Sequence, residues 1–171
     1  MTQSTEDQLS SFVQTHRADA IRFAWGLLGT EGHMAEDMAQ RAFAKAWQRR
    51  GSFRGTSQVK TWLFRIIVNE VRSYQRWRAV RSRAVFFLQW KDSLQVNAPP
   101  SGDVGLRHRL EAALGTLSAQ QREAFILVQI HGHSVKEASG LLRRSEGTIK
   151  THLHRARRKL KDQLADLWVE V

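Results

Sequence analysis

The sequence predicts an all-α protein built from two small helical domains that are joined by a flexible linker. Apolar residues recur at steps of three and four along most of the chain, and no alternating strand pattern of useful length occurs. Pro99 and Pro100 are the only prolines, and they lie together in a run of turn-forming residues from Val96 to Asp103. We therefore divide the chain into two expected domains and a linker, at residues 1–80, 103–171 and 81–102.

The first domain is expected to hold three helices. Thr5 and Gln8 match a capping box for the first helix, which ends near Leu28 because Gly29 follows it. The other two helices are expected from about Gly32 to Arg50, closed by Gly51, and from Thr56 or Ser57 to about Val80.

The second domain is expected to hold four helices, most of them marked by a serine cap. The first of the four covers about Asp103 to Leu114. The others are expected from Ser118 (capping box with Gln121) to Ile130, from Ser134 (capping box with Glu137) to Leu142, and from Ser145 as far as Trp168.

Composition narrows the class of protein. With 171 residues and 42% hydrophobic residues the chain can build real cores, and the absence of cysteine excludes disulfides and thiolate chemistry. The segment from Met1 to Ser10 lacks the pattern of a secretory signal, and apolar runs such as 84–88 are too short to cross a bilayer. We therefore expect a soluble, cytoplasmic protein.

The net charge of +11 indicates a polyanionic partner, with nucleic acid favoured over an anionic membrane surface. It divides into +5, +2 and +4 over the first domain, the linker and the second domain. A contact surface that spans both domains is therefore expected.

The expected third helix has two distinct faces at 100° per residue. Its apolar face comprises Val59, Trp62, Leu63, Ile66, Ile67, Tyr74 and Trp77. Its polar stripe, which contains no acidic residue, comprises Thr61, Arg65, Asn69, Arg72 and Arg76. An ordinary solvated face and a nucleic-acid face bordered by the aromatic ring of Trp62 both remain open on this pattern alone.

The expected last helix gives a sharper signal. Its core stripe comprises Ile149, Leu153, Ala156, Leu160, Leu164 and Leu167, and eight Lys or Arg residues but one acid lie between Arg143 and Lys161. A short helix, a tight turn at Arg143 and Arg144, and a serine-capped basic helix are typical of a helix-turn-helix that enters the major groove. A basic surface helix of a plain bundle is the alternative.

These motifs together resemble the sigma-70 family of bacterial factors, of the extracytoplasmic-function (ECF) type. The matching motifs in the first domain are Asp37-Met38-Ala39-Gln40, Phe43-x-Lys45-Ala46-Trp47, Ser52-Phe53-Arg54-Gly55 and Thr61-Trp62-Leu63-Phe64-Arg65-Ile66, followed by Asn69. In the second domain they are Ala113-Leu114-x-x-Leu117, Arg122-Glu123-Ala124-Phe125, Gly132-His133-Ser134, Ser145-x-Gly147-Thr148-Ile149-Lys150 and His154-Arg155-Ala156-Arg157. The resemblance implies a region 2 helical bundle and a region 4 helix-turn-helix in a promoter-recognition subunit of RNA polymerase.

The resemblance also implies roles for particular residues. Binding to core polymerase, through its β′ clamp helices, would involve Asp37, Gln40, Arg41 and Lys45, although an ordinary helix surface carries such a pair equally well. Recognition and melting of the −10 element would involve Phe53, Trp62, Arg65, Asn69, Arg72 and Arg76, with Phe53 and Asn69 at the pocket for a flipped base. A simple loop-to-core anchor is an equal alternative for Phe53.

The remaining implied contacts are those of the second domain and the linker. Recognition of the −35 element would involve Arg144, Ser145, Thr148, Lys150, Thr151, His152, His154, Arg155 and Arg158. The linker would thread towards the RNA exit path, and its apolar segment from Phe86 to Trp90 would bind a partner or, slightly favoured, form an extra helix packed on a domain. Other implied partners are the polymerase β flap and an anti-sigma factor that could hold the chain at the inner membrane, away from the nucleoid.

The sequence argues against an enzyme and leaves one alternative function open. An enzyme is not expected, because no phosphate loop or nucleophile motif occurs, and the His131/His133 and His152/His154 pairs are spaced two apart, which on a helix points them in different directions. No metal or cofactor is expected. An autonomous helix-turn-helix regulator that binds DNA alone is the alternative function.

Overall fold

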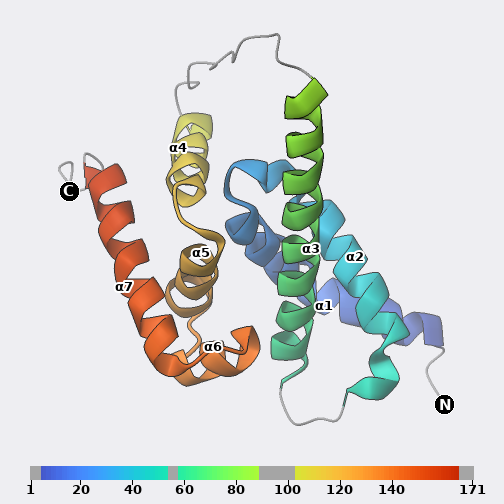
Figure 1. Ribbon diagram of the computed structural model, residues 1–171. Helices are drawn as coiled ribbons and strands as arrows, with labels where there is room; N and C mark the ends of the chain where they lie inside the picture. The colour runs from blue at the N-terminus through green and yellow to red at the C-terminus, as the bar shows by residue number, and fades with distance from the viewer. Residues whose placement is uncertain (1–4, 54–57, 89–102, 166–171) are drawn as a thin grey trace.

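The computed structural model describes residues 5–53, 58–88 and 103–165, with side chains from residue 10 and without those of 82–88, 103 and 104. Every regular element in these ranges is helical, which confirms the all-α class (Figure 1). In the first half these are α1 (Thr5–Leu28), η1 (Gly29–Met34), α2 (Ala35–Gln48), η2 (Arg50–Ser52) and α3 (Val59–Leu88). In the second half they are α4 (Asp103–Gly115), α5 (Ala119–Phe125), the π-helical η3 (Ile126–Ile130), α6 (Val135–Leu142) and α7 (Glu146–Gln163).

The first three α-helices pack on one another as a bundle. As expected, α1 ends at Leu28, and Gly29 follows with a φ of +61°, a conformation that favours glycine. The second helix begins later than expected, because Gly29–Met34 form a 3₁₀ turn that is interrupted at Glu31. The third helix, α3, continues to Leu88, past the expected end near Val80. The expected starts at Thr56 or Ser57 and the Thr5 cap lie outside what the structure describes.

Helix α3 is buried on more than the face that the sequence predicted. Leu63, Ile66 and Ile67 are buried as expected, but Trp77 is 56% exposed and that expectation was wrong. A second buried flank comprises Phe64, Val68 and Val71. This flank is apolar because α3 packs on α6 of the second half as well as on α1 and α2.

The second half follows its local sequence signals closely. Ser118 and Ser134 both form complete capping boxes, with Gln121 and Glu137, and the Ser145 hydroxyl accepts a hydrogen bond from the Thr148 backbone N–H. The side chains of Ile149, Leu153, Ala156 and Leu160 are buried, which confirms the core stripe of the last helix up to that point. Leu167 and Trp168 lie outside the described residues.

The two halves share one hydrophobic core. Helix α4 packs on η1, α5 on α1, and α6 on α3, so the second half lies along one side of the first (Figure 1). We call this contact the seam. Residues 89–102, which include both prolines and Trp90, are outside the described ranges, as are the side chains of 86–88. No helix in the described ranges combines the length and the apolar character needed to cross a membrane.

Candidate nucleic-acid interface

Helix α2 carries the four side chains that were expected to bind polymerase, and three of them lie on its accessible surface. The Asp37 carboxylate accepts from Arg41 Nη2 at 3.0 Å, one turn further along, and Gln40 beside them is exposed. Lys45 differs, because its Nζ lies 2.6 Å from Oε1 of Glu70, a largely buried residue of α3. Lys45 therefore compensates a buried charge between two helices and is only half exposed.

An aromatic pair lies where η2 leads towards α3. The ring centroids of Phe53 and Trp62 are 5.3 Å apart, with the planes tilted by 48°, and both side chains are partly buried. Asn69 is exposed about two turns along α3 from Trp62, on the same side. Phe53 thus packs on a ring that itself contacts the core, and both side chains keep part of their surface exposed.

The cationic stripe on α3 is divided by the seam. Asn69 and Arg76 are exposed. Arg72 donates from Nε and Nη2 to the two carboxylate oxygens of Glu123 on α5, each at 2.6 Å. These hydrogen bonds raise the pKa of the Arg72 guanidinium above its ordinary value.

Arg65, the other interior cation of the stripe, also faces the second half. Its Nη2 lies 3.3 Å from the backbone oxygen of Gly140 on α6. Its Nε is buried, with no hydrogen-bond partner among the described residues. Of the three arginines expected to hold DNA phosphates, Arg76 is therefore exposed, whereas Arg65 and Arg72 are engaged within the protein.

Two histidines fill the seam around Phe64. The His131 ring lies edge-on to Phe23 and Phe64, with centroid distances of 5.1 and 4.9 Å, and His133 contacts Phe64 at 5.9 Å. Burial lowers the pKa of His131 to about 4 and also lowers the pKa of His133, so both are neutral near pH 7. They act as packing groups, and no group of three or more potential metal ligands occurs among the described residues.

Helix α7 presents a broad basic surface. Arg143 adopts the left-handed conformation, with a φ of 54°, and thereby makes the tight turn between α6 and α7. The exposed candidates for DNA contact are Arg144, Ser145, Lys150, Thr151, His154, Arg155 and Arg158. Thr148 and His152 are only partly exposed, and burial lowers the pKa of His152, so it is neutral.

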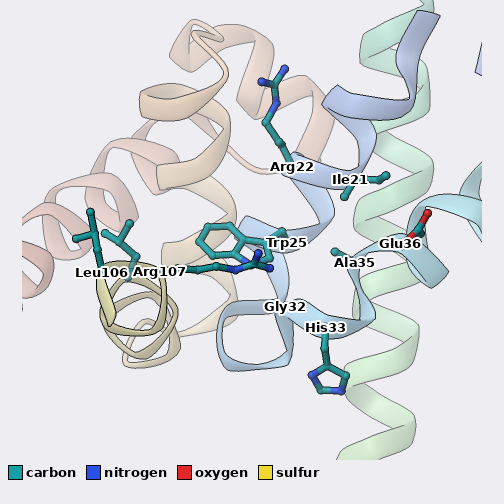
Figure 2. A pocket seen from close by; sticks show the side chains of 10 residues that line it. Ile21, Arg22, Trp25, Gly32, His33, Ala35, Glu36, Leu106 and Arg107 are labelled. Atoms are coloured by element: carbon teal, nitrogen blue, oxygen red, sulfur yellow. The ribbon is translucent and has the colours of Figure 1, made fainter. Parts of the chain in front are cut away.

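An apolar groove, which the sequence did not reveal, runs along the seam beside α1. Two adjoining cavities of about 550 and 750 Å³ share Arg22, Trp25 and Leu110. Figure 2 shows the first cavity, with Trp25 between α1 and the Arg107 side chain of α4. The Trp25 indole N–H donates to Glu111 at 2.8 Å. The groove arises where α1 meets α4 and, further along, α5, η3 and α7, so no local pattern could have predicted it.

Glu123 is the other residue whose position the sequence did not predict. It belongs to one of the sequence motifs that carry the resemblance, but its partner lies in the other half of the chain, 51 positions away. The only sequence signal was an acidic residue on the helix that precedes the basic helix-turn-helix.

Comparisons with known proteins match both halves of the chain. The family model for sigma-70 region 2 matches residues 12–81, and that for sigma-70 region 4 matches residues 107–160. The ECF RNA polymerase sigma factor EcfG of Rhodopseudomonas palustris is 32% identical over 161 residues, which cover 94% of this chain and 84% of that protein. The RNA polymerase sigma factor CarQ of Myxococcus xanthus is 30% identical, covering 82% and 80%.

Two solved structures are similar over most of the chain. The sigma factor RpoE in complex with the anti-sigma factor NepR from Bartonella quintana has a TM-score of 0.74 and 32% identity, with coverage of 92% of this chain and 97% of that chain. CnrH in complex with the cytosolic domain of CnrY has a TM-score of 0.67 and 26% identity, with coverage of 95% and 91%.

Proposed function

The chain belongs to the ECF group of the sigma-70 family and is an RNA polymerase sigma factor, and from this premise we propose which of its surfaces carry each step. The proposed domains are 1–80 for core binding and −10 recognition and 103–171 for −35 recognition, with 81–102 as the linker. The observation that carries the proposal is the presence of both sigma regions in one chain, each with a basic, accessible helical surface. The proposal includes no catalytic activity of the chain itself.

We propose that the α2 surface binds the clamp helices of the polymerase β′ subunit. Asp37 and Gln40 provide an exposed carboxylate and amide, and Arg41 lies one turn further on. Lys45 contributes less than its position in the motif implies, because Glu70 already holds its ammonium group. The β flap would be contacted by the second half.

The −10 element is proposed to be opened by capture of one strand rather than by an energy-consuming reaction. Extruding a base costs a few kcal/mol, and stacking on an aromatic side chain returns about 1–3 kcal/mol per base. Phe53 and Trp62 are partly exposed aromatic side chains suited to such stacking, and Asn69 and Arg76 lie exposed on α3 for polar and phosphate contacts. Arg65 and Arg72 would join them once the seam releases both.

The −35 element is proposed to be read in the major groove by α7. Lys150, Thr151 and Arg155 are exposed in its first turns, where a recognition helix meets base edges. Arg144 and Ser145 at its start, and Arg158 further along, are placed to hold phosphates, while His154 adds a further groove contact. Thr148 and His152 are expected to contribute less, because they are partly buried.

An anti-sigma factor is the proposed regulatory partner. The similar sigma factor RpoE of Bartonella quintana has been solved in complex with an anti-sigma factor. The apolar seam groove, with Arg22, Arg107, Arg157 and Lys161 around it, suits an amphipathic helix with acidic flanks. We propose that the chain works at the nucleoid in the cytoplasm and that this partner withdraws it, at the inner membrane if the partner is anchored there.

Run-off transcription with core RNA polymerase on a library of promoters tests the proposal. The expected result is transcription from a subset of templates that share one −10 and one −35 element, with none from core polymerase alone. Tight and specific promoter binding by the purified chain in the absence of core polymerase, with no transcripts in its presence, would instead establish the autonomous regulator.

A further inference from the structure

The ion pair between Arg72 and Glu123 joins the two halves with the geometry by which arginine binds phosphate. Two guanidinium nitrogens meet two carboxylate oxygens at 2.6 Å each, as a phosphate would accept them. The Glu123 side chain is only 8% exposed and that of Arg72 29%, so the pair is shielded from solvent. We propose that Glu123 acts as an internal mimic of a DNA phosphate, which occupies Arg72 in a closed chain and must be displaced before Arg72 can hold the −10 strand.

A second contact on the same helix face supports this inference. Arg65 lies seven residues before Arg72, about two turns away on the same side of α3, and it donates to the Gly140 backbone oxygen. Two separate elements, α5 and α6, thus cover two of the proposed phosphate contacts, whereas Asn69 and Arg76 beside them stay exposed. Coverage by two elements makes the occlusion a property of how the halves pack rather than of one rotamer.

The contact is suited to reversible opening. A buried ion pair gains little over solvated charges, because desolvation offsets most of the attraction between its members. When the seam opens, a strand phosphate restores the charge pairing of Arg72, and water hydrates the freed Glu123 carboxylate. The inference rests on the proposed function only for the identity of the ligand, since the closed contact itself can be measured without DNA.

A reversible covalent link across the seam provides the experiment. A Cβ atom added to Gly115 of α4 would lie 3.8 Å from the Cβ atom of Thr30 in η1, and disulfides have a mean Cβ–Cβ distance of about 3.8 Å. The chain contains no cysteine, so the double variant Thr30→Cys/Gly115→Cys holds one possible pair. Neither residue belongs to the proposed DNA or polymerase surfaces.

The disulfide is expected to form under mild oxidation and to lower binding of fluorescein-labelled oligothymidine at least about tenfold, because the open fraction falls. Reduction is expected to restore binding, and each single cysteine variant is expected to be unaffected by the oxidant. Failure of the pair to oxidise, or equal binding by the oxidised and reduced chains, overturns the proposal. A reduced chain that binds no strand overturns the assignment of α3 to DNA and the role of Glu123 with it, while the closed arrangement stands.

A charge-removing variant tests the role of Glu123 by an independent route. Glu123→Gln keeps the shape of the side chain but loses the charge that pairs with Arg72, so the open fraction and the affinity for oligothymidine are expected to rise about fivefold. Asp162→Asn removes the same charge from an exposed position on α7 and controls for net charge. Unchanged or weaker binding by Glu123→Gln, with the fold checked by circular dichroism, contradicts the inference.

Discussion

Phe64 is the side chain whose removal should most clearly report that the two halves fold as one unit. Its ring is fully buried and stacks on Phe23, with centroids 4.1 Å apart and planes 13° from parallel. The ring also makes T-shaped contacts with His131 and His133 of the second half. Phe64 therefore contributes to the core of the bundle and to the seam at the same time.

Phe64→Ala is expected to lower the free energy of unfolding by about 3–5 kcal/mol, the range for a phenylalanine removed from a core that cannot collapse around the cavity. At about 2–4 °C per kcal/mol for a chain of this size, the melting temperature should fall by about 6–20 °C. Thermal unfolding followed by far-ultraviolet circular dichroism and by calorimetry measures both quantities.

The matched control is Trp77→Ala on the same helix. The Trp77 ring is 56% exposed and contacts mainly Tyr74 and Arg81, so its loss is expected to cost no more than about 1 kcal/mol. If Phe64→Ala lowered the melting temperature no more than Trp77→Ala does, the buried packing of Phe64 would be refuted. If the chain unfolded in two separate thermal transitions, and Phe64→Ala lowered the midpoint of only one of them, the shared seam would be refuted.

Three further predictions concern pH, polymerase binding and promoter binding. Between pH 6.5 and about 4 the unfolded chain takes up a proton at His131 while the folded chain does not, so stability should fall by up to about 3 kcal/mol as pH is lowered; urea titrations should show His131→Leu flattening this decline. Asp37→Ala should weaken capture of core polymerase in a pull-down without changing duplex DNA binding, whereas undiminished capture, or an equal loss in Glu36→Ala, would count against the α2 surface. Arg155→Ala should lower −35-dependent run-off transcription several-fold and leave core binding intact, and unchanged transcription would reject its role.

The features that the sequence predicted well are those that depend on a few neighbouring residues. Ser118, Ser134 and Ser145 each accept a hydrogen bond from a backbone N–H three positions on, and this local chemistry fixes where α5, α6 and α7 begin. Gly29 likewise ends α1 by its own conformational freedom. Such signals need no knowledge of what the helix packs against.

The features that the sequence missed all depend on contacts between distant segments. The buried flank of α3 at Phe64 could not be inferred from a single amphipathic face, because Phe64 also meets His131 and His133 of the second half. Trp77 was expected in the core, yet it is 56% exposed, because the apolar face of α3 loses its buried contacts towards the end of the helix. The ion pair that Arg72 forms across the seam could not be predicted for the same reason. A cation that pairs with a distant residue has the same sequence pattern as one that faces solvent.

The division of the basic surface implies an order of events under the proposed assignment. In the closed arrangement the α7 residues Lys150 and Arg155 are exposed, whereas Arg65 and Arg72 of α3 are held by the second half. Duplex recognition at −35 therefore needs no rearrangement, but full capture of the −10 strand does. Because the seam and the strand compete for Arg72, a partner that binds the closed arrangement more tightly opposes melting, and one that binds the separated halves more tightly favours melting. Core polymerase, which must hold the two regions at the spacing of two promoter elements, would act in the second way.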